Sequence, residues 1–339
     1  MTKRFFALLV VVACGGAGAS TRPATAGPTA SASVAPPARA SAASVASPAP
    51  SASASAQTAA AEPDAPTVRV LEPGAEPRQP LRYAFARKHE SIRFDMKTTI
   101  AMTMGMIAVP PVTAPTIRME VEVQPSDVSA DGTLTATYRT TRVDLLADGT
   151  LPAAQRKTLA DSLHGLVGMS GRFVITSRGV TLESAVDVPP TAPQTVIDTM
   201  ESLQQSMRQL APVLPEEPVG IGARWEVHSR VRAKAMHLEQ VATYALAGRK
   251  GDVVDEDVTL VQSAPPQTMH LPGKAASAHV ELLSENGTGA GKVRRTLSGI
   301  ASISSLQLHT ETKMLTIAAG QKQPLDMSLT LEVQTKPLP

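Results

Sequence analysis

The chain of 339 residues contains a single cysteine, Cys14, and few aromatic residues. One thiol excludes an internal disulfide and a metal site built from several cysteines, so the folded part must be held together by its core. With five Phe, three Tyr and one Trp, that core has to be filled mainly by aliphatic side chains and methionine. No apolar run approaches the roughly 18 residues that a membrane-spanning helix needs. We therefore expect a mature chain that does not span a membrane.

An excess of basic charge is also missing. The whole chain carries a formal net charge of +2, but part of that charge precedes the region that looks globular. Residues 67–339 retain 28 basic and 28 acidic residues, since four basic and two acidic residues come earlier: Lys3, Arg4, Arg22, Arg39, Glu62 and Asp64. A domain of zero net charge lacks the basic excess of nucleic-acid-binding proteins, so we expect no nucleic-acid partner.

The first residues have the organisation of an export signal. Lys3 and Arg4 precede the apolar run 5–13, which is followed by small residues, as in secretory signal peptides. The sequence Val11-Val12-Ala13-Cys14 resembles the lipobox of bacterial lipoproteins. That resemblance implies removal of residues 1–13, acylation of Cys14 and anchoring of the chain in a membrane. The alternative is an ordinary secretory peptide cut after Ala17-Gly18-Ala19.

The resemblance also bears on location. Some inner-membrane lipoproteins carry an acidic residue after the lipidated cysteine, whereas this chain has Gly15. We expect a protein exported and lipid-anchored in the bacterial cell envelope, at the outer membrane and facing the periplasm.

Residues 14–66 are predicted to form a lipidated, disordered tether. Of residues 19–66, 36 of 48 are Ala, Ser or Pro, and none is aromatic. Such a composition buries too little apolar surface to offset the entropy of ordering, and the scattered prolines interrupt any helix. Residues 67–339 are predicted to be one strand-rich domain.

Alternation of apolar and polar residues predicts strands in that domain. In residues 93–106, one parity is apolar and includes Phe94, Met96, Ile100, Met102, Met104 and Met106. This period of two is typical of a strand with one buried face. The same alternation predicts strands over residues 117–123, 225–232, 254–260 and 327–333. Asp131-Gly132, Gly251-Asp252 and Asn286-Gly287 are predicted hairpin turns, and the parity slip at 140–142 predicts a bulge.

Two segments have helical spacing instead. Residues 152–166 place Leu159, Leu163 and Leu166 on one stripe, and residues 191–210 do the same for Val196, Met200, Leu203, Met207 and Leu210. Long strands twist, and both stripes need an apolar surface. We therefore predict an α+β fold: one long, strongly curved, mainly antiparallel β-sheet (a half-barrel) with two α-helices packed on its concave apolar face.

The domain resembles a family of bacterial lipoproteins of unknown function. The resemblance rests on residues 214–225, with Pro218, Gly222 and Trp225, on the opening residues 81–85 and on the central hairpin 172–179. The predicted architecture is also similar to the LolA-like envelope lipoproteins, in which a half-barrel sheet holds a lipid chain beneath covering helices. That likeness implies a lipid ligand, through fold analogy alone.

Motifs of catalysis are incomplete, so we expect no enzyme, no cofactor and no metal site. The stretch from Gly287 to Lys292 imitates a phosphate-binding loop but has Asn286 where the first glycine belongs. The pairs His237/Glu239 and His309/Glu311 each share one strand face, but this is the polar, outward face.

Methionine is flexible and suits surfaces that accept varied apolar partners. We therefore predict a lipid or another apolar small molecule in the sheet concavity, facing Phe94, Met96, Met102, Met104, Met106, Met119, Met200 and Met207. The alternative is a non-enzymatic structural or interaction lipoprotein, with a packed core, no ligand pocket and a protein partner that the sequence does not identify.

Overall fold

The computed structural model describes residues 65–86, 88–187, 212–233, 236–270, 279–318 and 320–339. The predicted signal peptide 1–13, the tether up to residue 64 and the predicted helix 191–210 lie outside these residues. The chain divides into two units, residues 19–62 and the remainder. All described residues belong to the second unit, to which the following account is confined.

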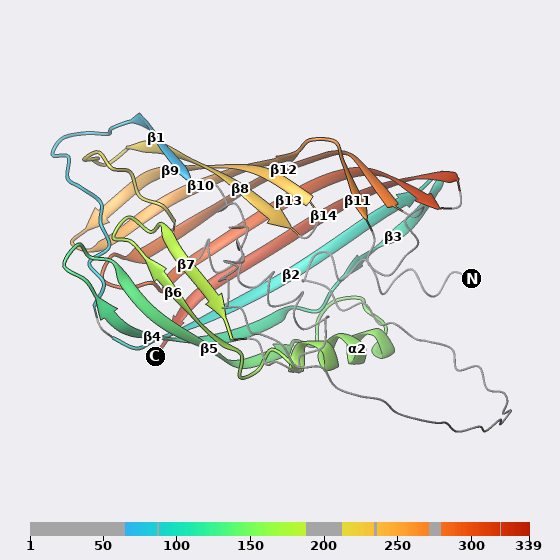
Figure 1. Cartoon of the computed structure of the whole chain (residues 1–339), viewed down its shortest axis with the longest axis horizontal. Coiled ribbons are helices and arrows are strands. Elements are labelled where there is room, and N and C mark those ends of the chain that lie inside the picture. The colour runs from blue at the N-terminus through green and yellow to red at the C-terminus, as the bar shows by residue number, and fades with distance from the viewer. Residues whose placement is uncertain (1–64, 87, 188–211, 234–235, 271–278, 319) are drawn as a thin grey trace, which may run out of the picture. The chain divides into compact units, whose positions relative to one another are not determined.

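The described residues are organised mainly as antiparallel strands, with one helix among them (Figure 1). The first seven strands and the helix are β1 (Thr67–Glu72), β2 (Glu90–Met104), β3 (Ile107–Thr113), β4 (Ile117–Val128), β5 (Leu134–Leu145), α2 (Ala153–His164), β6 (Ser170–Ile175) and β7 (Thr181–Val186). The others are β8 (Arg224–Ala233), β9 (Met236–Lys250), β10 (Val253–Ala264), β11 (Gln267–His270), β12 (His279–Thr296), β13 (Ser302–Ala318) and β14 (Gln321–Leu338).

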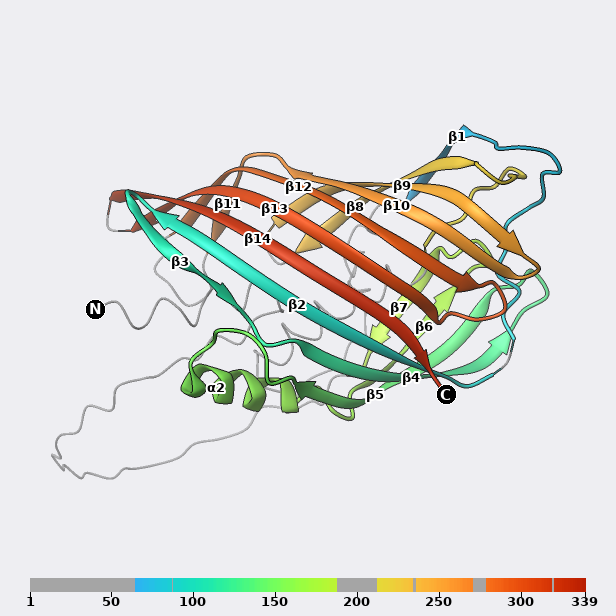
Figure 2. The ribbon, with the colours of Figure 1, turned by 180° about the vertical axis from the view of Figure 1, so that it is seen from behind.

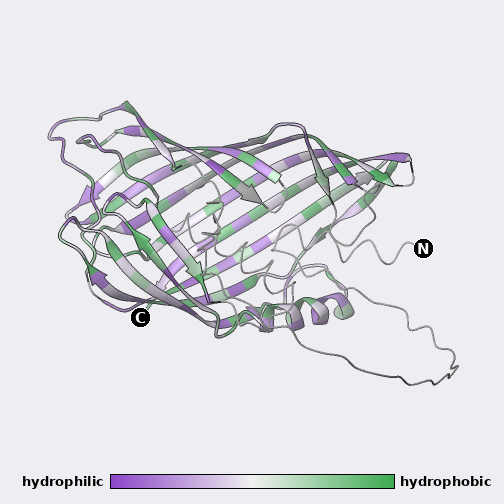
Figure 3. Ribbon diagram, in the orientation of Figure 1, coloured by the Kyte–Doolittle hydropathy of each residue, from purple (hydrophilic) through white to green (hydrophobic). Residues whose placement is uncertain are grey.

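One sheet contains all 14 described strands. Its order is β1-β8-β9-β10-β12-β13-β14-β2-β4-β5-β6-β7, with β11 paired to β12 and β3 paired to β2. Most neighbours are consecutive in the chain, but β14 pairs with β2 and so brings the last strand beside one of the first (Figure 2). Alternating hydropathy runs along the long strands (Figure 3), as the sequence period predicts.

The predicted fold class is wrong. The sheet is neither closed nor strongly curled, so it is not the predicted half-barrel. The one described helix, α2, lies beside β5 and not on a concave face. Of its predicted stripe only Leu163 is buried, while Leu159 and Leu166 stay partly exposed. Alternation identifies the apolar face of a strand, but it carries no information on how far neighbouring strands coil.

Two of the three predicted hairpin turns are present and the third is not. Turns at Gly132 and Gly251 are confirmed, and both glycines have positive φ, which favours glycine. The turn predicted at Asn286-Gly287 is wrong, because both residues lie inside β12, a strand of 18 residues. The stretch that imitates a phosphate-binding loop is therefore extended strand. The predicted bulge is confirmed, since the pairing with β4 shifts between Arg142 and Thr140.

The main core is formed by residues from strands near both ends of the sheet. It contains Trp225 of β8 and Val254 of β10, together with Tyr138 of β5 and Phe173 of β6. Two connections lie between these strands: residues 73–86 and 212–223 supply Leu81, Tyr83, Phe85, Val213, Leu214 and Val219 to the same cluster.

These connections are held by backbone hydrogen bonds. The amide of Tyr83 donates to the carbonyl of Ser177 at 2.7 Å, and that of Leu214 donates to the carbonyl of Arg178 at 2.8 Å.

Within the described residues, no helix has the length and hydropathy to cross a bilayer.

Candidate functional site

The pairing of β2, β14 and β13 builds an apolar face on the same side of the sheet as the main core but beyond its limit at Phe94. Met102 lies opposite Met327, Ile100 opposite Leu329 and Met96 opposite Val333. Residues directly opposite in an antiparallel pair project from the same side of the sheet. The next strand extends the row with Leu306 and Leu308. We call this the apolar face: Met96, Ile100, Met102, Leu306, Leu308, Met327, Leu329, Leu331 and Val333.

Most of the apolar face is only half buried. Ile100 is 8% exposed, but the other residues of the face are intermediate in exposure. Among the described residues, the main core along these strands ends at Phe94 and Met119, which pack against it. Half-buried leucines and methionines over several strands leave apolar surface in contact with solvent, which is the kind of surface that binds an apolar partner.

On β12 the same side of the sheet is made of glycine. Gly287, Gly289 and Gly291 lie opposite Thr310, Leu308 and Leu306 of β13. A Cβ at Gly291 would come within 2.4 Å of the Ser305 carbonyl oxygen, and one at Gly289 within 2.8 Å of the Gln307 oxygen. These glycines therefore let β12 and β13 approach closely, and the face has no side chains along that row.

A buried acid interrupts the apolar surroundings. Glu285 lies opposite Thr312 of β13 and Ala264 of β10, in the same row as the Met102–Met327 pair. Its exposure is 5%. Burial raises the pKa of Glu285, because removal from water disfavours the charged form. A carboxyl group accepts hydrogen bonds whether or not it is protonated, so Glu285 is suited to a polar donor on an otherwise apolar molecule.

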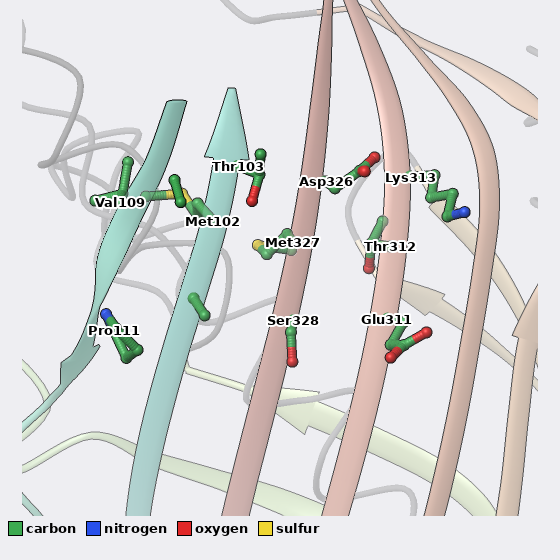
Figure 4. Close-up of a pocket in the computed structure, with 12 residues that line it drawn as sticks. Met102, Thr103, Val109, Pro111, Glu311, Thr312, Lys313, Asp326, Met327 and Ser328 are labelled. Carbon is green, nitrogen blue, oxygen red and sulfur yellow. The ribbon is translucent and has the colours of Figure 1, made fainter. Parts of the chain in front are cut away.

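A groove of about 440 Å³ opens among β2, β3, β13 and β14 (Figure 4). Its walls are mixed in character: Met102, Val109 and Met327 are apolar, whereas Glu311, Lys313 and Asp326 are charged. A second groove of about 470 Å³ lies between α2 and β5 and includes Arg156 and Lys157. Both grooves are open to solvent, so neither is an enclosed ligand cavity.

Six of the predicted ligand-facing residues lie in the described part of the chain, at different positions along β2 and β4 and at the turn after β2. Phe94 and Met119 face each other across β2 and β4 at the margin of the main core. Met96, Met102 and Met104 follow along β2, but Met106 is fully exposed at the turn after it. Met200 and Met207 lie outside the described residues.

Sequence reasoning did not identify several residues of the face. Leu329, Leu331 and Met327 belong to a strand that alternation predicted, but no feature of the sequence places that strand beside β2. Glu285 was missed because the predicted turn at residue 286 removed it from any strand face. Only the pairing of β12 with β10 and β13 shows where it lies.

The described part of the chain contains no group of three or more His, Cys, Asp or Glu side chains placed to hold a metal ion. His309 Nε2 lies 3.8 Å from Glu311 Oε1, and both side chains are largely exposed.

Comparisons with known proteins assign no family. No protein-family model matches the sequence, and no curated protein matches it. Among solved structures, a mutant of the Rh. blastica porin is 8% identical, and the match covers 71% of this chain and 99% of that one with a TM-score of 0.18. A structure described as "Asymmetric conductivity of engineered proteins" is 9% identical over the same shares, with a TM-score of 0.17. Scores this low define neither a fold nor a function for the chain.

Proposed function

We propose that this chain is an exported lipoprotein, acylated at Cys14, that binds a lipid or another apolar ligand on the apolar face. The observation that supports ligand binding is the half-buried surface of Leu308, Leu329 and Met327, beyond the limit of the main core. A lipid suits this surface because acyl chains need apolar contact and little directional bonding. The proposal includes no catalytic step.

Anchoring rests on the sequence alone. The basic start, the apolar run and Val11-Val12-Ala13-Cys14 support lipidation, and Gly15 supports the outer membrane facing the periplasm as the location. Cells grown with labelled palmitate are expected to incorporate the label into the natural chain and not into Cys14→Ser, because the substitution removes the acylated thiol. Equal incorporation into both chains would contradict a lipid anchor at Cys14.

Ligand binding is tested on the full chain purified from the cell envelope in mild detergent. Native mass spectrometry should show a stoichiometric, non-covalent adduct, and organic extraction should release the same molecule, whereas acyl groups on Cys14 stay attached. Leu308→Gln should reduce the adduct because it places an amide on the apolar face. The matched control is Ile303→Gln, which changes an exposed residue on the opposite face of β13 and should leave the adduct intact.

A second function is supported by a different observation. Both grooves in the described residues are open and partly charged, which suits a non-enzymatic interaction lipoprotein without a ligand pocket. A bare protein mass that stays unchanged after incubation with envelope lipids would overturn ligand binding. In vivo cross-linking would then be used to identify a protein partner.

A further inference from the structure

The turn between β2 and β3 is apolar where turns are usually polar. β2 ends at Met104, β3 begins opposite it at Ile107, and Gly105 and Met106 form the turn. Gly105 has a φ of 59°, a conformation that glycine adopts without strain. Met106 is 100% exposed and Ile107 68% exposed. We call residues 104–107 the hairpin tip.

Along the two strands of this hairpin, β2 and β3, charge is absent on either side of the tip. No charged residue occurs between Lys97 and Arg118. The neighbouring β13–β14 hairpin ends beside the tip, because Met104 pairs with Leu325 and the Gly105 amide donates to the Pro324 carbonyl at 3.0 Å. In that hairpin, the only charge between Lys313 and Asp326 is Lys322. Asp326 lies opposite Thr103 in the pairing with β2 and opposite Lys313 in the pairing with β13. Beyond these two charges, the two hairpin ends, side by side in Figures 1 and 2, carry one charge between them, and it is positive.

We propose that the hairpin tip inserts into the surface of a lipid bilayer. Met106 and Ile107 would enter the boundary between headgroups and acyl chains. Methionine adapts to a fluid apolar surrounding because its side chain is unbranched and flexible. Lys322 would keep its ammonium group at the level of anionic headgroups while its methylene stem follows the apolar surface. The Gly105 amide already has a backbone acceptor, which lowers the penalty for moving the turn out of water.

A protein strand is a poorer partner for this hairpin. β3 pairs with β2 and contains Pro110 and Pro111. Proline has no backbone N–H to offer, so it blocks the addition of a further strand along an edge. The most exposed apolar side chains are at the narrow turn and not along a flat surface. A bilayer surface accepts such a projection without requiring a complementary shape.

The first experiment reads the environment of the tip directly. The full chain carries Cys14→Ser, which removes its only natural thiol, and Met106→Cys, which is labelled with an environment-sensitive fluorophore. Vesicles of phosphatidylethanolamine and phosphatidylglycerol are added. A blue-shifted, brighter emission at position 106 is expected, as is quenching by nitroxide-labelled lipids. The control is the same label at Ile303→Cys, also exposed, at the end of β13 remote from the β13–β14 turn. Its emission should not change.

The second experiment compares two charge substitutions in the Cys14→Ser chain. Ile107→Glu should raise the lipid concentration for half-maximal vesicle binding by about tenfold or more, since burying one isoleucine contributes about that factor. Ile303→Glu should leave it unchanged. Equal binding by the two variants, together with emission at position 106 that stays at its value in water, would overturn the proposal. Concentration-dependent self-association lost in Ile107→Glu would instead assign the tip to a contact between copies.

These outcomes are separable from the proposed function. Loss of the extractable ligand from Leu308→Gln with normal insertion at position 106 would leave both proposals standing. If native mass spectrometry shows only the bare protein mass while insertion at position 106 is normal, ligand binding alone is overturned. Vesicle binding through the uncleaved residues 1–13 would not shift the emission of the fluorophore at position 106.

Discussion

Arg295 and Glu256 form an ion pair inside the main core: Arg295 Nη2 donates to Glu256 Oε2, and their side chains are 2% and 0% exposed. Arg295 Nη1 also donates to the hydroxyl of Tyr83 at 2.8 Å. The pair joins β10 and β12 to the connection 73–86. Two charges that are out of water depend on each other, because neither has solvent as a substitute partner.

Removing one member of that pair should be severe. Glu256→Ala leaves the Arg295 guanidinium buried without its carboxylate, and we expect the free energy of unfolding to fall by about 3–5 kcal/mol. Urea denaturation followed by circular dichroism measures the change. The neighbouring Asp257→Ala is the control, since it breaks only an exposed pair with Lys292 and should have a much smaller effect. Similar losses in both variants would show that burial of the pair does not matter.

The buried acid Glu285 should make stability depend on pH. Its pKa is raised above the ordinary value of 4.5 by burial, so the folded state holds the proton at pH values where the unfolded chain has released it. The stability that this residue contributes is therefore complete below the ordinary pKa value and is lost as pH rises through the raised pKa of the folded state. Glu285→Gln, which stays neutral, should be more stable than the natural chain at neutral pH and similar to it at low pH.

Thermal unfolding of both proteins across the acid range checks this expectation. Asp326→Asn on the opposite side of the sheet is a control for a general change in acidic charge. If Glu285→Gln unfolds at the same temperature as the natural chain at every pH, the carboxyl group has a compensating partner.

Two strand glycines should respond differently to alanine. A Cβ at Gly291 would lie 2.4 Å from the Ser305 carbonyl oxygen, which is a backbone atom that cannot rotate away. Gly291→Ala should therefore lower stability by about 1–3 kcal/mol, as overpacking does. At Gly248 the nearest atom is Asp255 Oδ2 at 3.6 Å, an ordinary contact. Gly248→Ala should be neutral or stabilising by up to about 1 kcal/mol, because it lowers the entropy of the unfolded chain.

Denaturation midpoints of the two variants, measured side by side, check the difference. If Gly291→Ala were tolerated as well as Gly248→Ala, the close approach of β12 and β13 at the glycine row would be wrong.

Trp225 should report on the docking of residues 212–223. The side chain is fully buried, stacks on Tyr244 with ring centroids 5.5 Å apart, and donates from Nε1 to the Val213 carbonyl at 3.2 Å. Trp225→Ala should lower stability by about 3–5 kcal/mol through the cavity it leaves. Trp225→Phe keeps most of the packing but leaves the Val213 oxygen without its donor, so a smaller loss of about 1–3 kcal/mol is expected.

The difference between these two variants, measured by denaturation, separates packing from hydrogen bonding. Equal losses would mean that the hydrogen bond from the indole, and not the volume of the ring, holds the connection in place.

The local structure of many strands could be read from residues alone. The alternation of Phe94 to Met104 predicted β2 because a strand with one buried face must repeat every two residues. The glycines at positions 132 and 251 predicted turns because they adopt positive φ without strain. The hairpin signal failed at Asn286-Gly287, where the glycine permits close packing of strands and does not form a turn. A glycine looks identical in the sequence in both roles.

The sequence by itself determined several of the strands, among them β2, β4, β8, β10 and β14, which side of each of these is apolar, and the alanine-, serine- and proline-rich composition before residue 67. These properties follow from period, propensity and composition, which act over a few residues. Only the tertiary structure decided that β14 lies beside β2, that Glu285 shares a row with Met102, and that the sheet stays open with α2, the helix among the described residues, beside β5. Such relationships depend on contacts between residues far apart in the chain, and no local pattern encodes which distant strand becomes a neighbour.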